Sequence, residues 1–237
     1  MYDQTTTRTT GIDDNQSTIF EPELGSPPDE AVLTDASETL ETGTTTVGLT
    51  ANNGIVLATD RRASAGNLVA SKNAQKILQV HSQAALTISG AVSAAQSLVR
   101  SLRSEVNLYE IRRNEAMSIQ ALATLTGNFL RSGAFIVVQP VLGGVDSEGS
   151  HVYSIDPAGS VMEEEYAVSG SGSPFALGVL EQEYDEDMSV DEARTVAVRA
   201  VQSAVERDTA SGNGLSLATI TDDGVEIVEY EEFGEAL

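Results

Sequence analysis

Gly43, Thr44, Thr45 and Thr46 lie where a polar N-terminal segment meets the first strand-like run. If the chain were cut after Gly43, the Thr44 hydroxyl would be a nucleophile and its own α-amino group a base. Such an amine has a pKa of about 8, but it accepts no proton while it is acylated, so the preceding segment would have to be removed. Gly43 suits a cleavage position because it adds no side-chain bulk. Taken alone, the threonine run is more typical of the start of a strand.

Asp60 and Lys76 favour the interpretation of Thr44 as a nucleophile over that of an ordinary strand residue. Asp60 ends the second strand-like segment, and Lys76 precedes the apolar run that begins at Ile77. An N-terminal nucleophile needs a nearby cation, which lowers the pKa of its hydroxyl and stabilises charge in the transition state. A carboxylate is needed to hold that cation. A buried Lys76–Asp60 pair beside Thr44 would supply both groups, although each residue taken singly is more often a turn or surface residue.

These residues belong to a series of motifs that resembles the archaeal-type proteasome β subunits, which are N-terminal-nucleophile threonine proteases. GTTTVG, ATDRRAS and KNAQKI follow one another at the spacing of that family. The resemblance extends from about Thr44 to Tyr230, and several ordered motifs make it specific. The later matching segments are Thr87–Gly90, Tyr153–Gly159, Gly170–Phe175, Gly178–Glu181 and Arg207–Gly212.

The resemblance implies a role for each matching site residue. Thr44 is similar to the nucleophile and, once exposed by cleavage between Gly43 and Thr44, to the general base. Asp60 and Lys76 resemble the pair that tunes it, and Gly90 resembles the backbone N–H donor to the oxyanion. The polar network around the Thr44 amine is expected from Ser171, Asp208 and Ser211. The alternative for the two serines is a loop hydroxyl that binds local backbone, and for Asp208 a loop carboxylate at a helix end.

Substrate preference is implied by seven positions that match the family's binding surface. Six of them are small, apolar or uncharged, which favours hydrophobic side chains before the scissile bond, and Ser64 resembles the strand position that hydrogen-bonds the substrate backbone. Plain core packing is the alternative for each. The stretch Ser93–Ala95 departs from the family pattern and leaves the far wall of the pocket open. The seven positions are Ala63, Ser64, Ala74, Leu78, Ile88, Val92 and Gln96.

Hydrophobic periodicity predicts strands, two helices, strands, two helices and strands. This order favours an α+β fold, and the resemblance implies a four-layer α-β-β-α sandwich of two antiparallel sheets flanked by helices, the N-terminal nucleophile hydrolase fold. Residues 1–43 are expected to be a removable, disordered acidic propeptide, and 44–237 the peptidase domain. Predicted helices cover 91–113, 118–130, 174–184 and 190–207. Val92 is expected in the buried stripe of the first helix, and Ser118 is expected to cap the second. Predicted strands lie within 44–60, around a turn at Asn52–Gly54, and at 77–81, 84–88, 135–142, 151–155, 162–168, 215–221 and 225–228.

Composition limits the other function classes. The 237 residues include no cysteine and two histidines, which excludes disulfides and a cysteine nucleophile and argues against a His-rich zinc site. A formal charge of −23 disfavours nucleic acid and anionic membranes as partners. With only two lysines, this acidity predicts a salt-adapted source. Because no signal peptide or membrane-spanning run is visible, we expect a cytoplasmic protein. The threonine-protease chemistry that the resemblance implies requires neither metal nor organic cofactor.

The resemblance also implies partners: seven-membered β rings inside α-subunit rings in a four-ring barrel, an ATP-driven unfoldase, and unfolded proteins as substrates. Three alternatives remain open. They are a non-catalytic structural β-type subunit, the bacterial-type two-ring threonine protease, and a salt-adapted binding module with a threonine-rich leader. A phosphate loop at Gly170–Ser173 is disfavoured because no Gly-Lys-Ser/Thr follows it.

Overall fold

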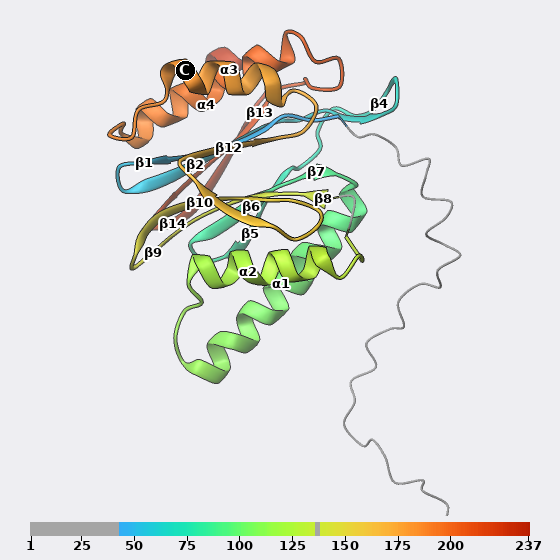
Figure 1. Ribbon diagram of the computed structural model, residues 1–237. Coiled ribbons are helices and arrows are strands. Elements are labelled where there is room, and N and C mark those ends of the chain that lie inside the picture. Colours follow the sequence, from blue (N-terminus) through green and yellow to red (C-terminus); the bar gives the residue numbers. More distant parts are fainter. Residues whose placement is uncertain (1–42, 136–137) are drawn as a thin grey trace, which may run out of the picture. The chain divides into compact units, whose positions relative to one another are not determined.

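Two five-stranded antiparallel sheets stack face to face in the computed structural model, which describes residues 43–135 and 138–237 (Figure 1). One pair of helices covers the outer face of the first sheet, and a second pair covers the outer face of the second sheet. The predicted α+β four-layer sandwich is therefore confirmed. The first pair is α3 (Ser173–Glu183) and α4 (Val190–Val205), and the second is α1 (Val92–Arg113) and α2 (Ile119–Arg131).

Each sheet combines pairs of consecutive strands with strands that are distant in the sequence. In spatial order, the first contains β12 (Tyr166–Ser169), β1 (Thr46–Ala51), β2 (Gly54–Asp60), β13 (Leu215–Thr221) and β14 (Gly224–Tyr230). The second contains β11 (Val161–Glu164), β10 (Gly149–Ile155), β9 (Val141–Asp146), β6 (Ala84–Thr87) and β5 (Ile77–His81). Two small sheets pair β3 (Ala63–Ala65) with β4 (Leu68–Ser71) and β7 (Ser89–Gly90) with β8 (Val138–Gln139), and a short 3-10 turn, η3 (Phe233–Glu235), follows β14.

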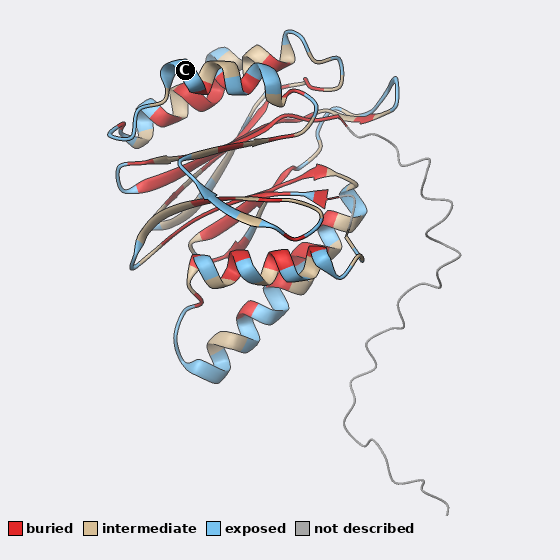
Figure 2. Cartoon of the chain, viewed as in Figure 1, coloured by how far each residue is buried: buried red, intermediate tan, exposed pale blue. Residues whose placement is uncertain are grey.

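The core has three apolar layers. The central one lies between the two sheets and includes Ile55, Leu57 and Val141. The other two lie between each sheet and its helices, with Leu102 in one and Val201 in the other. Buried residues accordingly line the inner faces of the helices in Figure 2. Because β1 and β2 pack between α4 on one side and β9 on the other, residues at the ends of these strands are held firmly.

The β1–β2 hairpin explains how Asp60 reaches Thr44. Asn52 and Asn53 form the predicted turn, where Asn53 has φ of 62° and Ala51 pairs with Gly54. Asparagine tolerates this left-handed conformation better than most residues. The antiparallel register then places Asp60 beside the residues just before β1, and its N–H donates to the carbonyl of Thr45 at 3.2 Å.

The predicted strand 162–168 is wrong as a single element. The structure divides it at Glu165 into β11, which pairs with β10 in the second sheet, and β12, which pairs with β1 in the first. The chain therefore crosses from one sheet to the other at this point. Strand periodicity is the same on both sides of the crossing, so it gave no sign of the change of sheet.

The predicted strand 135–142 also needs correction. Its described part contains β8 and the start of β9, which Pro140 separates, and a proline has no N–H to donate to a ladder. Gly143 and Gly144 lie inside β9 rather than in a turn. A Cβ on Gly143 would lie 2.6 Å from Ile55 Cγ2, so glycine here permits the two sheets to approach closely. Residues 136 and 137 lie outside the described residues.

The helix boundaries follow the sequence signals closely. Ser118 caps α2 as predicted, since its Oγ accepts the N–H of Ala121 at 3.2 Å. Helix α4 begins with a capping box formed by Ser189 and Glu192 and ends two residues before the predicted end. Val92, expected in the buried stripe of α1, is 38% exposed. The sequence did not predict the β3–β4 hairpin.

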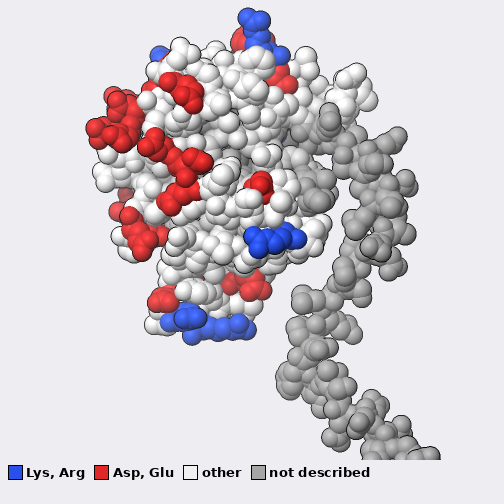
Figure 3. Space-filling view, viewed as in Figure 1, with Lys and Arg blue, Asp and Glu red and all other residues white. Residues whose placement is uncertain are grey.

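Two further expectations concern the surface and the N-terminal segment. Acidic side chains are spread over the face shown in Figure 3, where lysine and arginine are few. Among the described residues, no helix is both long and apolar enough to cross a membrane. The predicted propeptide, residues 1–43, lies outside the described residues except for Gly43.

Candidate active site

Thr44, Asp60 and Lys76 meet in the structure. Thr44 lies two residues before β1 and is only 2% exposed. Its hydroxyl donates to Asp60 Oδ1 at 3.0 Å and accepts a hydrogen bond from the Lys76 ammonium group. Lys76 Nζ also lies 2.6 Å from Asp60 Oδ1. The nucleophile candidate, a cation and a carboxylate are thus in direct mutual contact.

The Asp60 carboxylate is fully buried, and backbone donors hold it from two sides. Its Oδ1 accepts the N–H of Thr45 at 3.0 Å, and its Oδ2 accepts those of Arg62 at 3.1 Å and Gly212 at 2.8 Å. A buried charge is stable only when it is paired and hydrogen-bonded in this way. Asp60 therefore has a fixed orientation toward Lys76.

The buried environment of the site acts on Lys76. This residue is 5% exposed, and burial lowers its pKa below the usual value because a buried charge loses hydration. The Asp60 carboxylate opposes this effect and raises the pKa, but burial outweighs it. A lysine with a lowered pKa exchanges a proton with a hydroxyl more readily than an ordinary surface lysine does.

A second polar group surrounds the backbone nitrogen of Thr44. In this uncleaved chain the nitrogen is a peptide N–H, which occupies the position of the amine that cleavage would release. It donates to Ser171 Oγ at 3.2 Å, and that hydroxyl donates to Asp208 Oδ2 at 2.6 Å. Ser211 Oγ donates to the same Asp208 oxygen at 2.6 Å. The structure therefore brings all three residues of the expected polar network to Thr44.

Backbone of two loops encloses the Gly43–Thr44 bond. Gly172 N–H donates to the carbonyl of Thr44 at 3.3 Å. A Cβ on Gly43 would lie 1.8 Å from Ala210 Cβ, so a side chain before the bond has no room without displacement of the loop that follows α4. Glycine is therefore the residue that this site accommodates at the predicted cleavage position.

Comparison with known proteins shows the family to which the chain belongs. A family model for proteasome subunits matches residues 40–220. The chain belongs to the proteasome subunit family. "Proteasome subunit beta" of Haloquadratum walsbyi is 58% identical over 230 residues, covering 96% of this chain and 95% of the relative. "Proteasome subunit beta" of Haloferax volcanii is 56% identical over 234 residues, covering 98% and 96% respectively. "Proteasome subunit beta 2" of Haloarcula marismortui is 54% identical over 218 residues, covering 92% and 95%. These haloarchaeal relatives are consistent with the predicted salt-adapted source.

Gly90 ends β7 with φ of 103°, a conformation that favours glycine. The preceding residue is anchored firmly, since Ser89 Oγ donates to the carbonyl of Gln139 at 2.7 Å and lies 2.7 Å from Ser169 Oγ. Ser169 pairs with Thr46 across β12 and β1. Strand β7 is thus tied to the strand that follows Thr44. A role for Gly90 as oxyanion donor in this proteasome-family chain stays a prediction.

The seven expected substrate-binding positions range from core to surface. Ile88 is 3% exposed and belongs to the core beneath α1, whereas Val92 and Gln96 on α1 are exposed. Ser64 in β3 is buried, and its Oγ donates to the carbonyl of Ala210 at 3.0 Å. The three remaining positions, Ala63, Ala74 and Leu78, are half-buried. The assignment of a hydrophobic pocket stays a prediction.

Arg62 is a site residue that the sequence interpretation missed. Its Nε donates to Asn213 Oδ1 at 2.8 Å and its Nη1 donates to the carbonyl of Thr209 at 2.7 Å. The side chain therefore spans the loop that carries Ser211. Its position in the ATDRRAS motif, two residues after Asp60, was the available signal, but the sequence does not show which distant loop it contacts.

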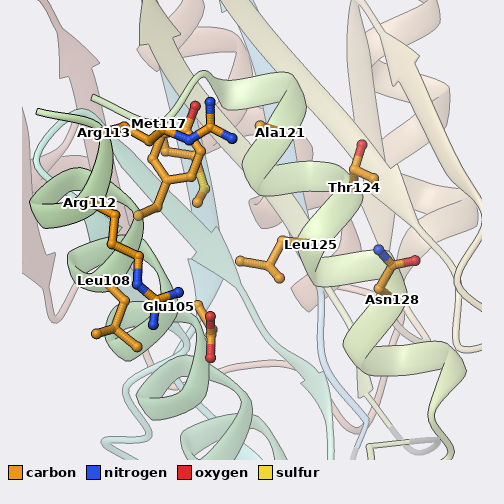
Figure 4. A pocket seen from close by; sticks show the side chains of 10 residues that line it. Glu105, Leu108, Arg112, Arg113, Met117, Ala121, Thr124, Leu125 and Asn128 are labelled. Atoms are coloured by element: carbon orange, nitrogen blue, oxygen red, sulfur yellow. The ribbon is translucent and has the colours of Figure 1, made fainter. Parts of the chain in front are cut away.

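A separate cavity of about 540 Å³ lies between α1 and α2 (Figure 4). Leu108 and Leu125 contribute apolar side chains, and Arg112 and Arg113 contribute basic ones. None of the residues assigned to the site lines this cavity. Within residues 43–135 and 138–237, no group of three histidine, cysteine or acidic side chains is arranged to hold a metal ion.

Gly170→Ala is expected to disable the site selectively. Gly170 has φ of 98°, and a Cβ there would lie 2.1 Å from the carbonyl oxygen of Thr44, so the variant must displace Thr44. A displacement of the reacting group by about 1 Å lowers the rate of the catalysed reaction about 100-fold. The matched control is Gly133→Ala, where φ is 82° but no atom lies within 4 Å. Both variants should lose about 1–2 kcal/mol of stability from backbone strain. Equal peptidase activities of the two assembled variants would contradict this account.

Proposed function

We propose that this chain is a catalytic β subunit of a proteasome core particle, a threonine endopeptidase that hydrolyses unfolded proteins. The observation that carries the proposal is the direct contact of the Thr44 hydroxyl with both Lys76 and Asp60. A structural subunit without activity has no need of this buried arrangement. Because burying charges costs stability, the pair is better explained by chemistry than by packing.

The proposal begins with self-processing. In the precursor, the Thr44 nitrogen is an amide and is not basic. The base in contact with the hydroxyl is the neutral amine form of Lys76, which burial favours by lowering the Lys76 pKa. Thr44 Oγ1 attacks the Gly43 carbonyl and gives its proton to that amine, and the Gly43–Thr44 C–N bond breaks as the nitrogen receives this proton from Lys76. The resulting ester is hydrolysed by water. Residues 1–43 leave as the propeptide, and residues 44–237 form the peptidase domain with a free amine at Thr44.

The mature enzyme repeats this chemistry on substrates. Thr44 Oγ1 gives its proton to the Thr44 amine as it attacks a peptide carbonyl, and that proton passes to the departing amine. The ester is then hydrolysed by a water that the Thr44 amine deprotonates. Lys76 and Asp60 stabilise the charge that develops at the hydroxyl. Ser171, Asp208 and Ser211 hold the amine in place, and Gly90 N–H stabilises the oxyanion. The residues supply every proton transfer, so the scheme requires neither metal nor organic cofactor.

Assembly belongs to the proposal as well. An exposed general protease would digest its host, which favours enclosure within stacked seven-membered rings, β inside and α outside, in the cytoplasm. Unfolded substrates would be delivered by an ATP-driven unfoldase. The side chains of Ala63, Ala74 and Val92 carry no charge, which supports cleavage after hydrophobic residues.

A peptidase assay on the particle assembled with its α subunits, in high salt, tests this function. We expect cleavage after leucine or tyrosine to exceed cleavage after arginine or glutamate by about 10-fold. Gln96→Glu should raise cleavage after basic residues several-fold, whereas Gln120→Glu, on an exposed face of α2, should not. An assembled particle without peptidase activity would support the structural-subunit alternative, and activity without preference would contradict the hydrophobic pocket.

A further inference from the structure

Thr45 is a buried polar residue to which the scheme above gives no role. It follows the nucleophile and is 0% exposed. Its Oγ1 lies 2.8 Å from Ser211 Oγ. Its N–H donates to Asp60 Oδ1, so one residue contacts both polar groups that surround Thr44: Asp60 through its backbone and Ser211 through its side chain.

The hydrogen-bond directions around Thr45 can be deduced. An ionised carboxylate only accepts, so the Ser171 and Ser211 hydroxyls must both donate to Asp208 Oδ2, at 2.6 Å each. Ser211 has a single hydrogen, and Asp208 receives it. In the 2.8 Å contact between Thr45 and Ser211, Thr45 is therefore the donor. The hydrogen bonds run from Thr45 through Ser211 to Asp208.

The side chain of Thr45 has little freedom to turn away from this contact. Gly172 lies so close that a Cβ there would be 2.0 Å from Thr45 Oγ1. Thr45 is thus held by the 170–172 loop on one side and by Asp60 on the other. A hydroxyl fixed in this way acts as a preorganised donor, which costs no reorientation during reaction.

We infer that Thr45 is a positioning residue whose hydroxyl keeps Ser211 directed at Asp208 and so sets the protonation of the Thr44 amine. The inference rests on the proposed function, because only a processed chain has that amine. Ser171 is the group that receives the N–H of Thr44, and Asp208 is the carboxylate behind it. Without the Thr45 donor, the Ser211 oxygen faces a methyl group, and its O–H, no longer polarised by that donor, makes a weaker hydrogen bond to Asp208.

A weaker hydrogen bond from Ser211 leaves the Asp208 charge less neutralised, and a less neutralised carboxylate favours the ammonium form of the nearby amine. The other charged groups near Thr44 are Asp60 and Lys76, which pair with each other, and Arg62, which binds the 209–213 loop. These groups are unchanged by substitution at Thr45. The amine pKa is therefore expected to rise, which places more of the enzyme in the inactive protonated form at neutral pH.

The test compares Thr45→Val, which keeps the shape of threonine but lacks the hydroxyl, with Thr45→Ser, which keeps the hydroxyl. Thr46→Val is the matched control, since Thr46, the next residue and the first of β1, is equally buried but donates to the carbonyl of Ser169 at 3.4 Å. The assembled particles are assayed for kcat and KM on a hydrophobic peptide between pH 6 and 9. Thr45→Val should lower kcat about 10-fold with KM within about 2-fold, and should shift the acidic limb of the profile upward by about half a pH unit or more. Thr45→Ser and Thr46→Val should resemble the wild type.

Ser211→Ala removes the other end of the same hydrogen bond and supplies a second test if Thr45→Val does not assemble. It should shift the acidic limb in the same direction, and the double variant should be no worse than Ser211→Ala alone. An active wild type with Thr45→Val unchanged, or equal losses in Thr45→Val and Thr46→Val with an unmoved limb, would overturn the inference alone. A wild-type particle without peptidase activity would overturn the proposed function and this inference with it.

Discussion

Thr44→Ala is expected to retain residues 1–43 and to lose peptidase activity by about four orders of magnitude or more, as removal of a catalytic nucleophile does. Alanine lacks the oxygen that lies between Lys76 and Asp60, so neither the Gly43 carbonyl nor a substrate can be attacked. Intact mass and peptidase rate are measured on the same assembled particle. Assembly should persist, because Lys76 and Asp60 still contact each other when the hydroxyl is removed.

Thr44→Ser provides the control, because a serine hydroxyl at the same position can still act as nucleophile. It should process itself and retain measurable activity. Thr46→Val should do likewise, which separates the nucleophile from the rest of the threonine run. Peptidase activity in a Thr44→Ala particle would show that another residue is the nucleophile.

Asp60→Asn is expected to abolish activity and to destabilise the fold. The side chains have nearly the same shape, but an amide has one acceptor oxygen, whereas Asp60 accepts hydrogen bonds at both oxygens. The backbone N–H groups that donate to one of the two Asp60 oxygens lose their acceptor, and Lys76 is left as an unpaired buried cation. Removal of one member of a buried ion pair costs about 3–5 kcal/mol. Chemical denaturation and processing of the precursor report the two effects separately.

Asp223→Asn is the matched control, because that carboxylate lies in the exposed turn between β13 and β14. It removes the same charge from the chain without touching the site, so stability and processing should remain near those of the wild type. If Asp60→Asn processed itself at the wild-type rate, the Lys76–Asp60 pair would have no part in the chemistry.

Local sequence signals were sufficient to predict the position of Asp60, which the β1–β2 hairpin brings beside the residues before β1. Asn52 and Asn53 mark the turn, and once the register is set, Asp60 must lie beside the residues that precede β1. The apolar period of α1 and the cap at Ser118 likewise depend on neighbours in the sequence. These features are local, so a single sequence contains the information that specifies them.

The contacts that the sequence did not reveal are those between distant segments. The segment around Glu165 has one strand pattern but serves two sheets, because the change of partner depends on β1 and β10. Thr45 looked like part of a strand-forming run, and only the fold places Ser211 next to its hydroxyl. The positions of Ser171, Asp208 and Ser211 were expected from family resemblance, since no local pattern joins residues so far apart.

Intact mass spectrometry of this chain, purified from the particle assembled with its α subunits, tests the central claim most directly. The account predicts a chain that begins at Thr44 in the wild type and at residue 1 or 2 in Thr44→Ala, with peptidase activity only in the former. A wild-type particle that cleaves peptides while every copy of this chain retains residues 1–43 would contradict it.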